Sequence, residues 1–207
     1  MGQLISIIGN TGVGKTTLAQ ALCATGQFVA GLEQHAQRPF QTLFAGDLPR
    51  YALANQVDYL LLRAEQEEAL RAFAGTGVVD GGLDQDFFVF TRLFHRHGYL
   101  SGREYDLCER LYRQLRRLMP APDLFIHLTA PIEVLTARFL ARHRSLEIAR
   151  VEDVPLIDDL LADWLAREKP RSLLTIDTAA DRDGFRHLVP NLVLEIDRRL
   201  RPPSAST

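Results

Sequence analysis

The chain has 207 residues, of which 46% are hydrophobic and 24% charged, and its formal net charge is −2 at pH 7. These values fit one globular domain with a sizeable core and argue against a general nucleic-acid or membrane partner. No apolar run is long enough to span a membrane. We expect no targeting peptide, because the first predicted strand begins close to the start of the sequence. Cys23 and Cys108 are interpreted as free thiols, so we expect a cytoplasmic location.

Short apolar runs alternate with long helical patterns along the chain. The predicted strands cover residues 4–8, 28–30, 77–80, 124–128 and 173–176. The predicted helices cover residues 52–74, 83–97 and 103–119, one that begins near Pro131, and 183–200. This alternation predicts a five-stranded parallel sheet with helices on both faces and ligands at the carboxyl ends of the strands. We expect one domain over residues 1–200, with 201–207 as a disordered tail.

The first strand leads into a glycine-rich segment that fits the phosphate-binding P-loop pattern G-x-x-x-x-G-K-[ST]. The segment reads Gly9-Asn10-Thr11-Gly12-Val13-Gly14-Lys15-Thr16-Thr17, and a helical pattern follows it. Glycines let successive N–H groups converge on phosphate oxygens, and the helix adds its positive N-terminal end. We predict that these residues bind ATP, that Lys15 reaches the β- and γ-phosphates, and that Thr16 offers its hydroxyl to Mg²⁺.

Two acidic residues lie at the carboxyl ends of predicted strands, where the nucleotide is expected to bind. Glu33 comes just after the second strand, where it could take a proton from an acceptor hydroxyl as a general base; a solvated loop acid is the alternative. Asp80 ends the third strand, where an acid commonly faces Mg²⁺. Its alternative role is to cap the helix that follows.

The helix at 52–74 carries Gln56 and Arg63 seven residues apart, hence on one face. The next helix carries Asp86 and Phe90 four residues apart. These four residues could line a small-molecule pocket. The alternatives are surface decoration for Gln56 and Arg63, core packing for Phe90 and a first-turn helix acid for Asp86.

Arg138, Arg142 and Arg144, followed by Glu147, crowd the end of the helix that begins near Pro131. Arginines in such a segment can close over transferring phosphates as a lid, at about residues 138–150. A solvated basic face is the alternative.

Together these motifs resemble the deoxyribonucleoside kinase family, from Gln3 to about Thr178. The family's base-binding glutamine and arginine match Gln56 and Arg63, and its second acid and stacking phenylalanine match Asp86 and Phe90. The lid pattern R-x-x-x-R-x-R-x-x-E matches the arginines and glutamate at 138–147.

The resemblance implies a catalytic base at Glu33, charge stabilisation by Lys15, Arg63 and the lid arginines, and a metal site at Asp80 and Thr16. It also implies that Glu147 holds the 3′-hydroxyl, and that two chains pair through a helical face within 52–74 or 103–119.

Two departures from the family pattern stand out. The family follows the third-strand acid with Arg-Ser, whereas this chain has Asp80-Gly81-Gly82. The family also places a tyrosine before the base-binding helix to contact the 3′-hydroxyl, and the matching position here is Ala45.

The expected reaction is transfer of the γ-phosphoryl group of ATP to the 5′-hydroxyl of a deoxyribonucleoside. An Arg63–Asp86 pair would hold an ionised acceptor that suits an exocyclic amino group, so deoxyadenosine, deoxyguanosine and deoxycytidine are predicted over thymidine. A nucleoside monophosphate kinase and a nucleotide-binding regulatory protein with a degraded site are the alternatives.

Overall fold

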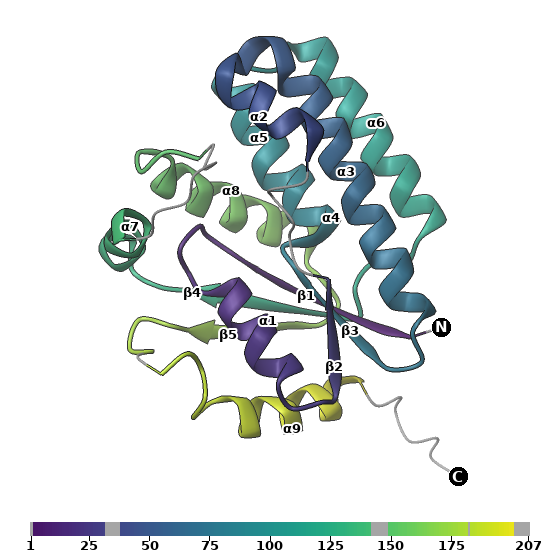
Figure 1. Cartoon of the computed structure of the whole chain (residues 1–207), viewed down its shortest axis with the longest axis vertical. Coiled ribbons are helices and arrows are strands. Elements are labelled where there is room, and N and C mark those ends of the chain that lie inside the picture. The colour runs from purple at the N-terminus through teal and green to yellow at the C-terminus, as the bar shows by residue number, and fades with distance from the viewer. Residues whose placement is uncertain (1, 32–37, 142–148, 182, 201–207) are drawn as a thin grey trace.

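Five parallel strands form the centre of the molecule in the computed structural model, which describes residues 2–31, 38–141, 149–181 and 183–200 (Figure 1). The strands are β1 (Gln3–Gly9), β2 (Phe28–Gly31), β3 (Thr76–Asp80), β4 (Leu124–Thr129) and β5 (Leu173–Asp177). Their order in the sheet is β2-β3-β1-β4-β5. All five predicted strands and the parallel sheet are confirmed; the three central strands β1, β3 and β4 are runs of mostly buried residues, whereas the edge strands β2 and β5 are mostly half-buried or exposed.

Helices connect the strands and cover both faces of the sheet (Figure 1). The helical elements, in chain order, are α1 (Lys15–Cys23), α2 (Pro39–Gly46), α3 (Leu48–Ala72), α4 (Gly82–Gln85), the π-helical segment η2 (Asp86–Thr91), α5 (Arg92–Arg96), α6 (Gly102–Leu118), α7 (Ile132–Ala141), α8 (Asp153–Glu168) and α9 (Val189–Leu200). No described helix is long and apolar enough to cross a membrane.

Successive side chains of β1 point to opposite faces of the sheet, and each face has its own layer of core residues. Ile5 and Ile7 pack with side chains of α1 and α9 on one face of the sheet. Ile8 packs on the other face with side chains of α2 to α6 and of α8. Since neighbouring residues of a strand point to opposite faces, this continuous apolar run requires helices on both sides.

Four helical regions differ from prediction. The helix expected at 83–97 is divided into α4, η2 and α5, because the backbone widens into a π-helix at Asp86–Thr91. The helix expected at 183–200 begins only at Val189, because Gly184 and Phe185 both adopt a left-handed backbone (φ 68°). Neither α2 nor α8 was predicted. Of these, α8 has the three-four spacing of buried residues typical of an amphipathic helix, from Val154 to Trp164.

The predicted lid and tail fall partly outside the described residues. Helix α7 carries the start of the predicted lid, whereas residues 142–148 and the tail 201–207 lie outside the description.

Candidate active site

The P-loop lies between β1 and α1 and has the backbone that its glycines require. Gly9, Gly12 and Gly14 have φ of 146°, 79° and 106°, in the region that favours glycine. A Cβ at Gly9 would lie 2.5 Å from the carbonyl oxygen of Leu128, so the loop also packs too closely against β4 for a side chain. Gly14 is the N-cap of α1, which places the helix N-terminus at the loop.

The side chains of Lys15 and Asn10 both bind backbone groups of the P-loop. The ammonium of Lys15 donates to the carbonyl oxygens of Gly9 and Asn10, both at 3.0 Å. The amide of Asn10 donates to the carbonyl of Val154 on α8 at 2.8 Å and accepts from the N–H of Thr11 at 2.7 Å. Lys15 therefore binds the start of the loop, and Asn10 connects the loop to α8.

Asp80 faces the P-loop at the end of β3. Its carboxylate accepts a hydrogen bond from the hydroxyl of Thr16, and Asp80 is 4% exposed. The N-cap of the following helix is Gly81, without a side-chain cap, so the alternative role of Asp80 as a capping residue is wrong. A carboxylate and a hydroxyl at hydrogen-bond distance supply the hard oxygen ligands that Mg²⁺ prefers, so Asp80 and Thr16 fit this ion.

Arg63 and Asp86 form a buried ion pair between α3 and η2. The guanidinium Nε lies 2.5 Å from a carboxylate oxygen, and the side chains are 3% and 7% exposed. Gln56 is 1% exposed and donates to the backbone carbonyl of Asp86 at 3.2 Å. Surface decoration by Gln56 and Arg63 is therefore wrong, and the predicted Arg63–Asp86 pairing is confirmed.

The π-helical turn holds this acid in place. Thr91, five residues after Asp86, donates its hydroxyl to the Asp86 carbonyl at 3.0 Å. Phe90, in the same turn, is half-buried against the apolar layer over this face of the sheet. Its predicted stacking on a base stays a prediction.

The comparisons with known proteins agree with this arrangement. The family model described as "Deoxynucleoside kinase" matches residues 5–197. The chain belongs to the deoxynucleoside kinase family.

The curated relatives of this kinase family include two proteins of modest identity. The chain is similar to a deoxyadenosine kinase of Dictyostelium discoideum, 32% identical over 146 residues, which are 70% of this chain and 59% of that protein. It is also 26% identical to a deoxyadenosine/deoxycytidine kinase of Bacillus subtilis over 147 residues, 70% of this chain and 68% of that one. The match thus spans less than two thirds of the Dictyostelium protein.

Solved structures share the deoxynucleoside kinase fold. The deoxyadenosine kinase of M. mycoides with bound dCTP superposes with a TM-score of 0.79 at 17% identity, over 93% of this chain and all of that one. Its complex with dATP gives 0.78 at 18% identity over the same shares.

The Gly81-Gly82 departure from the family pattern has a structural basis. Gly81 and Gly82 have φ of 85° and 78° and turn the chain sharply from β3 into α4. The Gly81 N–H donates to Ile7 at 2.8 Å, and the Gly81 carbonyl accepts from the Ser6 hydroxyl at 2.8 Å. A Cβ at Gly81 would lie 3.8 Å from a guanidinium nitrogen of Arg63, so the charge of Arg63 lies beside this turn.

Arg138, the first predicted lid arginine, reaches the end of the sheet beside the P-loop. Its guanidinium donates to the hydroxyl of Thr178 at 3.1 Å and to its carbonyl at 2.7 Å. The Thr178 hydroxyl in turn lies 3.2 Å from the carbonyl of Val13 in the P-loop. Arg138 therefore holds its charge next to the loop by binding the segment after β5.

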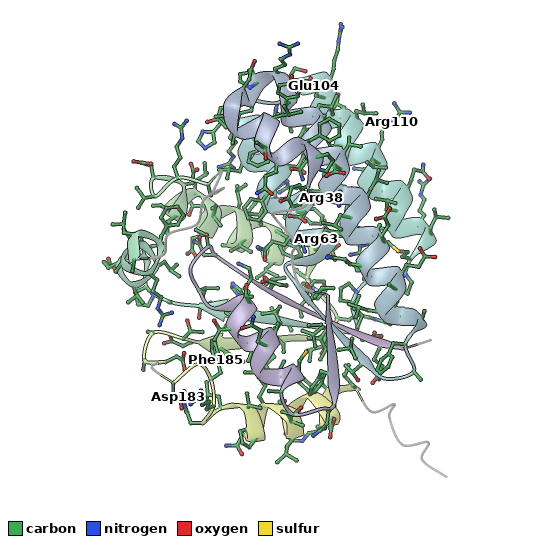
Figure 2. All side chains as sticks on the ribbon, viewed as in Figure 1. Arg38, Arg63, Glu104, Arg110, Asp183 and Phe185 are labelled. Atoms are coloured by element: carbon green, nitrogen blue, oxygen red, sulfur yellow. The ribbon has the colours of Figure 1, made fainter. Side chains whose placement is uncertain are left out.

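That segment also covers the start of α1. Figure 2 shows Phe185 next to α1, and a Cβ at Gly14 would lie 3.0 Å from the Phe185 ring. Phe185 is 2% exposed and its N–H donates to Asp181 at 2.9 Å.

Other predicted residues lie outside the described parts of the chain. These are Glu33, Arg142, Arg144 and Glu147. The segment with Glu33 is followed by Arg38, which pairs with Asp58 on α3, its Nε donating at 2.8 Å. At the tyrosine position of the family, Ala45 is exposed, while its neighbour Phe44 is fully buried against Phe94.

Gln85 is a site residue that the sequence analysis missed. Its side chain is bound to Gly9 of the P-loop at both polar atoms. Nothing in the linear spacing signals this contact, because it depends on the turn at Gly81 and Gly82.

Proposed function

We propose that this protein transfers the γ-phosphoryl group of ATP to the 5′-hydroxyl of a deoxyribonucleoside. The single observation that supports this most is the buried Arg63–Asp86 pair, in a chain that also has a complete P-loop. A P-loop alone indicates any nucleotide phosphate. A buried, ion-paired acid beside a buried glutamine adds a polar site for a second, neutral ligand.

The described residues would divide the work of phosphoryl transfer. Backbone N–H groups of residues 10–14 and the N-terminus of α1 would bind the phosphates, and Lys15 would leave its carbonyl partners to neutralise charge on the transferred group. Asp80 and Thr16 would hold Mg²⁺, which when bound neutralises phosphate charge. Glu33 is proposed to accept the proton of the attacking 5′-hydroxyl.

The acceptor base would be read by Gln56 and Asp86. The Arg63 guanidinium keeps the Asp86 carboxylate ionised and fixed, so this group can only accept hydrogen bonds. An exocyclic amino group satisfies it, whereas a thymine carbonyl would face it without a proton. We therefore propose preference for deoxyadenosine, deoxyguanosine or deoxycytidine over thymidine, by about tenfold to a hundredfold in kcat/KM. Among these three we propose the purine deoxynucleosides, since both relatives are deoxyadenosine kinases, one of them with deoxycytidine as a second substrate.

A turnover screen tests this proposal. The purified chain is incubated with ATP, Mg²⁺ and each of the four deoxynucleosides, and the monophosphates are separated and counted. Turnover of an amino-bearing deoxynucleoside above thymidine is expected. Thymidine as the best substrate refutes the base assignment, and turnover of monophosphates alone favours a monophosphate kinase. ATP binding without turnover of any acceptor favours a regulatory protein.

The proposed assembly is a homodimer formed through a helical face that includes α3 or α6. Leu61 on α3 and Leu107 and Leu118 on α6 are exposed by 41%, 45% and 82%, a high exposure for leucine that supports a covering partner. Sedimentation velocity of the wild type and of Leu61→Glu tests it, with a shift of the variant to monomer expected. The free thiols of Cys23 and Cys108 accord with the proposed cytoplasmic location.

A further inference from the structure

The side-chain amide of Gln85 binds both backbone groups of Gly9. The Gly9 N–H donates to Gln85 Oε1 at 2.9 Å, and Gln85 Nε2 donates to the Gly9 carbonyl at 3.1 Å. Gln85 is 1% exposed, and both contacts are buried. Gly9 is the first residue of the P-loop, so this glutamine contacts the point at which the loop leaves the sheet.

The Gln85 side chain makes the hydrogen bonds to β1 that β3 would make if it were longer. β1 pairs with β3 as far as Ile7, opposite Asp80, and the Gly81 N–H still donates to the Ile7 carbonyl. In a strand, the backbone groups of Gly9 face the same edge as those of Ile7. β3 has ended there, so without Gln85 the N–H and carbonyl of Gly9 would lack that strand's partners in a buried place. The primary amide supplies the donor and the acceptor that a further residue of β3 would have supplied.

The chain on either side of Gln85 is fixed by other elements. The Leu83 N–H donates to Glu67 on α3 at 3.1 Å. Asp84 accepts from Arg116 on α6 at 2.7 and 2.9 Å, and from the Tyr112 hydroxyl at 2.7 Å. Burial opposes the charge on Arg116, yet the carboxylates of Asp84 and Glu67 raise the pKa of this guanidinium. The backbone that carries Gln85 is therefore held from two helices.

We propose that Gln85 is a positioning residue for the donor phosphates. By fixing the peptide groups of Gly9, it keeps the following N–H groups of the P-loop in the orientation that binds phosphate. The Gly9 carbonyl that it binds is also one of the two that hold Lys15. The Gly81-Gly82 turn makes this contact possible, since it returns the chain toward β1 within four residues. The inference rests on the proposed function only in that the P-loop binds the phosphates of a nucleotide.

The test measures binding of Mg·ADP and of deoxyadenosine separately by isothermal titration calorimetry. Gln85→Leu keeps the size of the side chain and removes its amide, and Gln85→Asn keeps the amide but shortens its reach. We expect the Kd for Mg·ADP to rise about tenfold or more in both variants, because the buried Gly9 N–H loses its partner and the Gly9 carbonyl keeps only the Lys15 ammonium. The Kd for deoxyadenosine is expected to change less than about twofold.

Gln41→Leu is the matched control, because it makes the same change at another buried glutamine, on α2. Its Kd for Mg·ADP should equal that of the wild type. An unchanged Kd for Mg·ADP in a folded Gln85→Leu variant overturns the inference, as does an equal loss for both ligands. If Gln85→Leu does not fold, Gln85→Asn decides by the same two criteria. A wild type that binds no Mg·ADP overturns the proposed function, and the inference with it.

Discussion

A side chain at Gly81 should destabilise the fold although there is room for it. Gly81 has φ 85° and ψ −71°, and the nearest atom to an added Cβ is 3.8 Å away. The penalty in Gly81→Ala therefore comes from the backbone alone, about 1–3 kcal/mol for a residue held in such a region. A chain of this size loses about 2–4 °C of Tm per kcal/mol, so we expect a fall of roughly 2–12 °C.

Gly81→Arg separates backbone strain from charge. It restores the residue type of the family motif, but it adds a second cation beside Arg63 in a buried place, so its Tm should fall further than that of Gly81→Ala. Both are measured by thermal unfolding, with kcat determined below each Tm. Gly46→Ala, at a glycine without close neighbours, is the control and should leave the Tm unchanged or slightly raised. A Gly81→Ala variant as stable as the wild type would refute the reasoning.

Four further predictions concern the site and the sheet. Lys15→Ala should remove most turnover in a steady-state assay, because the lysine neutralises charge in the transition state. Glu33→Gln should lower kcat by roughly two to four orders of magnitude and leave ATP binding nearly intact; full kcat would exclude Glu33 as the base. Asp86→Ala should lose the discrimination between deoxyadenosine and thymidine, measured as a ratio of kcat/KM, and an unchanged ratio would contradict its role. Burial lowers the pKa of His127 from its ordinary 6.5, so the unfolded chain binds the proton at a higher pH than the folded chain does. The free energy of unfolding should therefore fall as the pH drops below about 6.5. The Tm of His127→Gln should fall less than that of the wild type when the pH is lowered from about 7 to about 5, as measured by thermal unfolding.

The sequence predicted the features that depend on local pattern. The glycines, lysine and threonine of the P-loop have fixed spacing, and the strands are short apolar runs, so both could be predicted before the structure. The Arg63–Asp86 pair was also predictable, because the resemblance placed both residues in one pocket.

Other features depend on contacts between distant segments and could not be predicted in this way. The Gly81-Gly82 pair was interpreted as a lost arginine, whereas the structure shows a turn that brings Gln85 to Gly9. The late start of α9 depends on Phe185, a bulky residue at positive φ that no propensity favours. The missed α2 has only eight residues, too few for its periodicity to be distinctive.

The burial of the Arg63–Asp86 pair bears on how base preference can change during evolution or in the laboratory. Replacing either partner alone leaves the other charge buried and unpaired, at a cost of about 3–5 kcal/mol, a large share of the about 5–15 kcal/mol that stabilises a typical domain. Single substitutions at these two positions should therefore lower stability whatever they do to base preference. Libraries that randomise positions 63 and 86 together should therefore yield thymidine-accepting variants that are more stable than those from libraries of either position alone.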